Sequence, residues 1–169
     1  MFGRIESWWT QWHATKNHGF ELIEFLSINE ENIQSYSPIA GSFAVISCSG
    51  KYLMCYNDFR KQWELPAGHR EAGETSKVCA IRELFEETGQ VVEDMKFIGL
   101  LKLKNVLNGQ YKYNPVYFTS LDRLQPFVKN NETSIIKLWD LKEAIGFVDD
   151  IDIQVVEIIE QLNKCLDQI

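Results

Sequence analysis

The apolar residues of this chain fall into short runs separated by turn residues. The runs are rich in β-branched and aromatic side chains, a composition that predicts strands. Ser49-Gly50 predicts a tight turn between the second and third runs, and Asn108-Gly109 joins the fourth and fifth. The predicted strands cover residues 20–27, 43–48, 52–56, 96–104, 111–119 and 134–139.

Two other stretches have the periodicity of amphipathic helices. Residues 75–88 predict the first helix, with Thr75 or Ser76 as its cap and Gly89 as a left-handed stop. Its apolar side consists of Ile81, Leu84, Phe85 and Thr88. The second helix, residues 151–166, has an apolar stripe suited to packing on a core: Ile151, Val155, Ile158, Ile159, Leu162 and Leu166.

The order of strands and helices predicts an α+β domain with an α/β/α layered arrangement. The 169 residues and 45% apolar content suit a single folded domain over residues 1–169. Residues 1–19 are polar but contain Trp8, Trp9 and Trp12, for which core packing, a homodimer contact and stacking on a base remain alternatives.

The polar side of the first helix concentrates carboxylates. At about 100° per residue, Glu83, Glu86 and Glu87 share with Arg82 an arc of about 140°. Side chains three and four apart on a helix are neighbours, so these acids repel unless a cation lies between them, and Arg82 offsets only part of the repulsion. Clustered carboxylate oxygens suit Mg²⁺ first and Mn²⁺ second. A solvated acidic face with ordinary ion pairs is the alternative interpretation.

The segment before this helix changes from a strand to a loop. Residues 63–68 predict a strand end, because Pro66 and Gly68 interrupt regular structure. Gly68 and Gly73 also allow the backbone to approach a ligand closely. The loop and the acidic helix face therefore form one candidate site.

The spacing of these residues resembles the Nudix box, here residues 68–90. The family pattern is a Gly, five residues, a Glu, seven residues, Arg-Glu, an aliphatic residue, any residue, Glu-Glu, any residue, Gly and a final aliphatic residue. The polar and glycine positions are filled by Gly68, Glu74, Arg82, Glu83, Glu86, Glu87 and Gly89. Leu84 fills the internal aliphatic position, whereas Gln90 stands where the last aliphatic residue is expected.

The resemblance implies a Nudix fold, a mixed β-sheet sandwiched between helices, and an enzyme that hydrolyses phosphoanhydride bonds. It implies Mg²⁺ ligands at Gly68, Glu83, Glu86 and Glu87. Glu74 is then a supporting partner or an extra ligand, and Arg82 orients the acids. An activated water attacks one phosphorus of a pyrophosphate and releases a nucleoside monophosphate. For the general base, Glu87 is the first candidate and Glu132 the second, with an ordinary loop acid as the alternative for Glu132.

The resemblance gives two conflicting indications of the substrate. The residues that lead into the box, Leu65-Pro66-Ala67-Gly68, resemble those of ADP-ribose and nucleotide-sugar hydrolases. The proline that these hydrolases usually have about fifteen residues after the box is missing, since that region here is Asn105-Val106-Leu107. Chain length and Tyr117-Phe118 look more like MutT-type triphosphate hydrolases, including those that clear oxidised guanine nucleotides. This (d)NTP pyrophosphohydrolase is the primary expectation. ADP-ribose or nucleotide-sugar hydrolysis, RNA 5′-end hydrolysis and a non-catalytic ligand-sensing module are the alternatives.

Three residues ahead of the box are candidates for substrate binding. Arg60 and Lys61 are cations suited to a distal phosphate, and Trp63 is suited to stacking on a base. A surface or core role is the alternative for each.

Composition and charge limit the classes of molecule that the protein is expected to bind. The net charge of −7 argues against coating duplex nucleic acid, which needs clustered Lys and Arg, and leaves a small-molecule nucleotide as the expected partner. No apolar run approaches the roughly 20 residues of a membrane span. The four cysteines, Cys48, Cys55, Cys79 and Cys165, lack zinc-type spacing, so we expect reduced thiols and a cytoplasmic protein.

Overall fold

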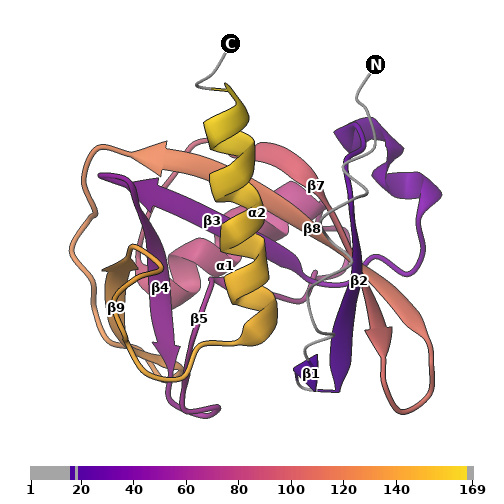
Figure 1. Cartoon of the computed structure of the whole chain (residues 1–169). Helices are drawn as coiled ribbons and strands as arrows, with labels where there is room; N and C mark the ends of the chain where they lie inside the picture. The colour runs from indigo at the N-terminus through magenta and orange to yellow at the C-terminus, as the bar shows by residue number, and fades with distance from the viewer. Residues whose placement is uncertain (1–15, 18, 167–169) are drawn as a thin grey trace.

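A mixed β-sheet forms the centre of the computed structural model, which describes residues 16–17 and 19–166 (Figure 1). Its strands are β1 (Lys16–Asn17), β2 (Phe20–Leu26), β3 (Ser42–Cys48), β4 (Lys51–Asn57), β5 (Gln62–Glu64), β6 (Ala67–Gly68), β7 (Lys96–Asn105), β8 (Tyr111–Leu121) and β9 (Thr133–Trp139). Their order is β1-β2-β7-β8-β3-β4-β5, while β6 pairs with β3 and β9 with β4. The β3–β8 pair is parallel, and β2–β7 and β7–β8 are antiparallel.

Helices cover both faces of this sheet. In the view of Figure 1, α2 (Asp150–Leu166) crosses in front of the strands and α1 (Ser76–Thr88) lies behind them. Successive side chains of a strand point to opposite faces, and the buried strands β3 and β4 follow this rule. One face packs Ala44, Ile46 and Leu53 against α1, and the other packs Val45, Tyr52 and Met54 against α2. The predicted α/β/α layers are confirmed.

The predicted strands and helices are present, with ends that differ by one or two residues. The turn at Ser49-Gly50 has φ of 52° and 72°, the left-handed values of a tight hairpin turn. The sequence patterns did not predict β1 or the 3-10 helix η2 (Glu30–Ser35). Residues 63–68, predicted as a strand end that turns into a loop, contain most of β5 and all of β6. Trp8, Trp9 and Trp12 lie outside the described residues.

The buried side of α1 is shifted relative to the predicted apolar side. Phe85 is 55% exposed, whereas Ala80, Leu84 and Thr88 are fully buried. These three residues are four apart and define the line along which the helix contacts the sheet. Phe85 lies at the rim of that contact, and the buried side extends instead to Glu87.

Gln90, which departs from the aliphatic position of the box pattern, is fully buried and hydrogen-bonded. Its Nε2 donates to the carbonyls of Thr88 and Gln125 at 3.1 and 3.0 Å, and its Oε1 accepts from the N–H of Gln125 at 2.7 Å. The side chain of Gln125 in turn accepts a hydrogen bond from the N–H of Val91 and donates one to the carbonyl of Val91. Two glutamines thus join the end of α1 to the loop before β9.

Replacing Gln90 with leucine is expected to lower the free energy of unfolding by about 1–3 kcal/mol, because polar groups around it lose their partners. Urea denaturation measures the change. Gln34→Leu, on the exposed side of η2, is the control and is expected to have little effect. Equal stability of Gln90→Leu and the parent chain would show that an aliphatic residue serves equally well.

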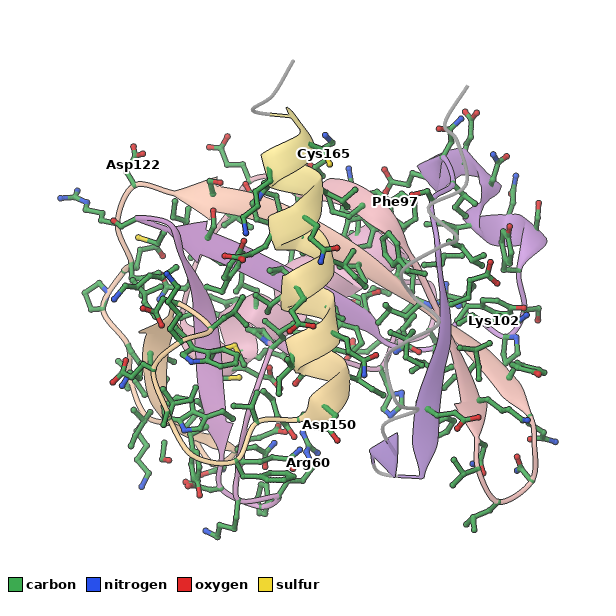
Figure 2. The ribbon with its side chains drawn as sticks, viewed as in Figure 1. Arg60, Phe97, Lys102, Asp122, Asp150 and Cys165 are labelled. Atoms are coloured by element: carbon green, nitrogen blue, oxygen red, sulfur yellow. The ribbon has the colours of Figure 1, made fainter. Side chains whose placement is uncertain are left out.

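The cysteines described by the structure are free thiols, of which Cys48, Cys55 and Cys79 are buried and Cys165 is exposed. Cys165 lies on the last turn of α2, near the top of the view in Figure 2. Within the described part of the chain, no helix is long and apolar enough to cross a membrane.

Candidate functional site

The acidic helix α1 is fixed at both ends by local interactions. Thr75 caps its start by accepting from the N–H of Val78 at 3.2 Å. Gly89 ends it in the left-handed conformation, at φ 72°, and donates to the carbonyl of Phe85 at 2.8 Å. These caps set the rotation of the helix and hence the direction of its carboxylates.

Two of the predicted acids lie against β6. A Cβ built on Gly68 would overlap the carboxyl group of Glu83, so this side chain occupies space that only glycine leaves open. Glu87 accepts from the N–H of Ala67 at 3.1 Å, and Cys79 donates through Sγ to the carbonyl of Gly68 at 3.3 Å. The strand end and the helix therefore meet at Gly68.

Arg82 connects the acids of the box to one another. Its Nη1 donates to Glu83 Oε1 at 2.7 Å and to Glu86 Oε2 at 2.9 Å. Its Nε and Nη2 form a bidentate pair with Glu74 at 2.7 and 3.0 Å, and Nη2 also reaches the carbonyl of His69 at 2.9 Å. A single guanidinium thus orients three carboxylates and the loop after β6.

Glu74 has the contacts of a supporting residue. Both of its oxygens bond Arg82, and Oε2 also accepts from the N–H of Glu71 at 2.9 Å. The hydrogen bond from Arg82 lowers the pKa of Glu74 to about 2. Because its oxygens are engaged in this way, the arrangement favours the supporting role over that of an extra metal ligand.

Glu132 reaches the site from the loop before β9. Its Oε1 accepts from Asn57 Nδ2 at 3.0 Å, and its backbone carbonyl accepts from the N–H of Asp58 at 2.8 Å. Asn130 accepts the N–H groups of Glu132 and Thr133 and donates to the carbonyl of Glu87 at 3.3 Å. Two asparagines therefore hold the second candidate base beside the end of α1.

Of the three residues predicted to bind substrate, Arg60 lies beside an acid of the site, whereas Lys61 and Trp63 form no hydrogen bond or ion pair with the box acids among the described residues. Arg60 is bonded to Glu64 at 2.6 and 2.7 Å and lies 3.5 Å from Glu132, while Lys61 is exposed in the turn between β4 and β5. Figure 2 shows Arg60 at the end of the molecule where α2 begins.

Trp63 takes the core role that the sequence left as the alternative. Its ring is 7% exposed and packs edge-on against Tyr56, and its Nε1 donates to the carbonyl of Ile145 at 2.7 Å. The structure does not offer this ring for stacking on a base.

Burial raises the pKa values of the carboxylates nearest Gly68. Glu87 is 6% exposed, and burial together with the charges of Glu132 and Glu83 raises its pKa well above the usual range. Burial also raises the pKa of Glu83, although Arg82 opposes the shift. Buried groups with raised pKa values are frequent at functional sites because their charge is costly unless a ligand stabilises it.

Sequence reasoning missed several residues that shape the site. Glu64, on β5, is 8% exposed and holds Arg60, and Asn57 and Asn130 hold Glu132. Glu64 alone had a local signal, since it is a charged residue between the apolar residues Trp63 and Leu65. Asn57 reaches Glu132 across 75 residues of sequence, and Asn130, which is only two residues from Glu132, reaches the carbonyl of Glu87 across 43 residues. No local pattern reveals the two long-range contacts.

The predicted metal ligands fit a divalent cation chemically but are not gathered around one point. Across residues 19–166, no three His, Cys, Asp or Glu side chains are positioned to hold one ion. Arg82 Nη1 lies between Glu83 and Glu86, 2.7 Å from Glu83 Oε1 and 2.9 Å from Glu86 Oε2. The carboxylates of Glu83 and Glu87 and the carbonyl of Gly68 nevertheless supply the oxygen donors that Mg²⁺ prefers.

Comparison with known proteins gives a family match across most of the chain. Residues 37–160 match the model of the NUDIX domain. The mRNA-decapping protein g5R of African swine fever virus (isolate Pig/Kenya/KEN-50/1950) is 35% identical over 98 residues, which cover 51% of this chain and 39% of that protein. Phosphatase NudJ of Escherichia coli (strain K12) is 37% identical over 65 residues, which cover 37% of this chain and 42% of that protein. The chain thus spans about two fifths of the length of these relatives.

A solved structure shares the fold over nearly the whole chain. The pyrophosphohydrolase BsRppH of Bacillus subtilis, crystallised as a mutant, superposes with a TM-score of 0.67 and 19% identity. The superposition covers 91% of this chain and 98% of that one. At this identity the likeness shows the fold alone.

Proposed function

The chain belongs to the Nudix domain family, and from this membership we propose that it is a hydrolase of pyrophosphate bonds in nucleotides. The observation that supports this most is the packing of Glu83 and Glu87 against β6 at Gly68, with Arg82 oriented by Glu74. Non-catalytic ligand-binding domains of this fold commonly lose these acids, and this chain keeps all of them.

The metal site we propose consists of the Gly68 carbonyl and the carboxylates of Glu83, Glu86 and Glu87. A bound Mg²⁺, with Mn²⁺ as a substitute, supplies positive charge against the phosphate oxygens and makes water more acidic. Glu83 and Glu86 would have to give up part of their contact with Arg82 to hold the ion, and the bond of Arg82 to Glu74 would keep the guanidinium in place.

We propose Glu87 as the general base. A carboxylate whose pKa is raised by burial accepts a proton more readily than an ordinary one near neutral pH. Water attacks one phosphorus and forms a new P–O bond, its proton passes to Glu87, and the bridging P–O bond breaks with its electrons on the leaving phosphate group. Glu132, held by Asn57, is the second candidate.

The substrate we propose is a nucleoside triphosphate, as in MutT-type hydrolases, with oxidised guanine nucleotides included. ADP-ribose or a nucleotide sugar is the second candidate, favoured by Leu65-Pro66-Ala67-Gly68. The resemblance to a decapping protein adds RNA 5′ ends as the third. Mg²⁺-dependent release of phosphate or pyrophosphate from a panel of all three tests the proposal. Binding of one ligand with no turnover of any would show a sensing module instead.

We further propose that the protein acts in a reducing compartment such as the cytoplasm, because its described cysteines are free thiols. A homodimer through residues 1–19 also stays a prediction. Sedimentation of the full chain, compared with a chain lacking those residues, tests it.

Metal affinity is expected to increase with pH. Burial raises the pKa values of Glu83 and Glu87, so protons compete with the cation at pH values above the usual carboxyl range. The same acids bind protons more tightly when folded than when unfolded, so the metal-free protein should lose stability as the pH rises through the raised pKa values. Melting temperatures with and without Mg²⁺ or Mn²⁺, at pH 5.5 and pH 8, measure both effects. A stabilisation by metal that is equal at the two pH values would contradict this assignment of ligands.

A further inference from the structure

A groove of about 580 Å³ adjoins the candidate site immediately after β6. One wall is formed by Ile39 and Ala40, and the other by the loop of residues 69–74 that connects Gly68 to α1. The groove therefore begins one residue beyond the backbone carbonyl that is a predicted metal ligand.

Both walls are held by hydrogen bonds. In the loop, Glu74 donates its N–H to the carbonyl of Glu71 at 3.1 Å and accepts the N–H of Glu71 on its side chain at 2.9 Å. Arg82 ties the carbonyl of His69 to α1 at 2.9 Å. The opposite wall is fixed because Ala40 donates to the carbonyl of Tyr113 at 2.8 Å. A ligand entering the groove meets a preformed surface, which reduces the entropy cost of binding.

Arg70 contributes an exposed cation to this groove, and its charge also acts on the hydroxyl of Tyr117, which is bonded to Glu30. The Arg70 side chain is exposed and forms no ion pair or hydrogen bond with any residue of the described range. The two other arginines near the acids are both engaged, Arg60 with Glu64 and Arg82 with Glu74. Glu74 carries no free charge toward the groove because of that pairing, and Glu71 remains as an exposed acid in the lining.

We propose that Arg70 binds the phosphate that lies beyond the scissile anhydride, so that the substrate carries at least three phosphates in a row. The proposal rests on the proposed hydrolase function and deepens it, because it distinguishes a triphosphate from a nucleotide sugar. Arg70 follows Gly68 by two residues, which span at most about 7 Å of backbone.

The chemistry of the groove suits the end of a phosphate chain. A guanidinium presents several N–H donors in a planar fork that matches phosphate oxygens, and such charge-assisted bonds are among the strongest in proteins. A diphosphate whose two phosphorus atoms flank the scissile bond has no further phosphate to place there. A sugar in that position would leave the guanidinium without an anionic partner.

The test compares Arg70→Gln with the parent chain on a nucleoside triphosphate and on the matching diphosphate. Arg123→Gln, an exposed arginine of the loop after β8, is the matched control. We expect Arg70→Gln to lower kcat/KM for the triphosphate by about tenfold to a hundredfold, mostly through KM, and to leave the diphosphate within about twofold. An equal loss on both substrates, or no loss on either, overturns the proposal.

A binding measurement separates this proposal from the hydrolase function itself. The probe is a nucleoside triphosphate with a methylene bridge between its α and β phosphorus atoms, titrated in Mg²⁺ buffer by calorimetry. Weaker binding to Arg70→Gln than to Arg123→Gln supports the Arg70 contact, even if the parent chain hydrolyses nothing and the proposed function fails. Equal binding to both variants overturns the contact, even if the parent chain is an active hydrolase.

Discussion

Glu87→Gln is expected to lower kcat/KM for pyrophosphate hydrolysis by on the order of 10³-fold, since a positioned acid or base contributes about 10²- to 10⁴-fold. The same substitution should raise the stability of the metal-free protein at neutral pH. Burial raises the pKa of Glu87, so its charged form opposes folding above that pKa, and glutamine removes the charge while keeping the shape. Loss of activity with a gain in stability is typical of a residue retained for function.

Initial-rate kinetics and thermal unfolding in EDTA at pH 7.5 measure the two effects of Glu87→Gln. Glu93→Gln removes an exposed acid just beyond α1 and is expected to change neither quantity appreciably. If Glu87→Gln kept more than half of the parental kcat/KM, Glu87 would be neither base nor ligand. A fall in stability as large as a core truncation would indicate a structural role instead.

Gly68→Ala is expected to reduce kcat by about a hundredfold, because misplacing a reacting group by about 1 Å has an effect of this size. The added methyl group would occupy the position of the Glu83 carboxyl group and push that side chain away from β6. The backbone of Gly68 has no positive φ, so alanine adopts it without strain. The overlap involves the flexible end of a side chain, and the melting temperature should therefore change little.

Gly41→Ala provides the contrast for Gly68→Ala. Its added methyl group would meet the backbone carbonyl of Gly68, which moves only if β6 moves with it. We therefore expect Gly41→Ala to lower both activity and melting temperature, whereas Gly68→Ala lowers activity alone. Full activity of Gly68→Ala would show that the position of Glu83 against β6 is irrelevant to the reaction.

The sequence predicted most of this fold because its elements carry local signals. The strands alternate or run apolar, Gly89 ends α1 in the left-handed conformation, and Ser49-Gly50 forms the expected turn. Phe85 is a residue whose burial the helical periodicity did not predict correctly. A residue at the edge of an apolar stripe is buried only if the partner surface extends that far, and the sheet does not.

In the candidate site, too, the local relations were predictable from the sequence and the tertiary ones were not. Glu83, Glu86 and Glu87 lie on one short helix, so spacing alone predicts that they are neighbours. Phosphate binding by Arg60 stays a prediction, and the sequence did not reveal its ion pair with Glu64, which depends on how β5 pairs with β4.

The residues that the sequence did not reveal act across tertiary contacts. Asn57 meets Glu132 because β9 pairs with β4, and Arg70 is available because Arg82 satisfies the nearby acids. Each of these relations needs knowledge of which segments become neighbours, and this knowledge is absent from a local pattern.

The pairing of β6 with β3 places Gly68 and Arg70 in different structural settings. Gly68 lies opposite Ser42 in a strand pair anchored in the core, whereas Arg70 and the rest of the groove wall belong to the loop that follows. Changes in that loop can therefore alter which nucleotide is chosen without moving the carbonyl beside Glu83. The loop is still linked to the acids, because Arg82 bonds the carbonyl of His69 and Glu74 as well as Glu83 and Glu86. We therefore expect substitutions at the exposed Arg70 to change substrate preference alone, and substitutions that disturb Glu74 or His69 to change the reaction as well.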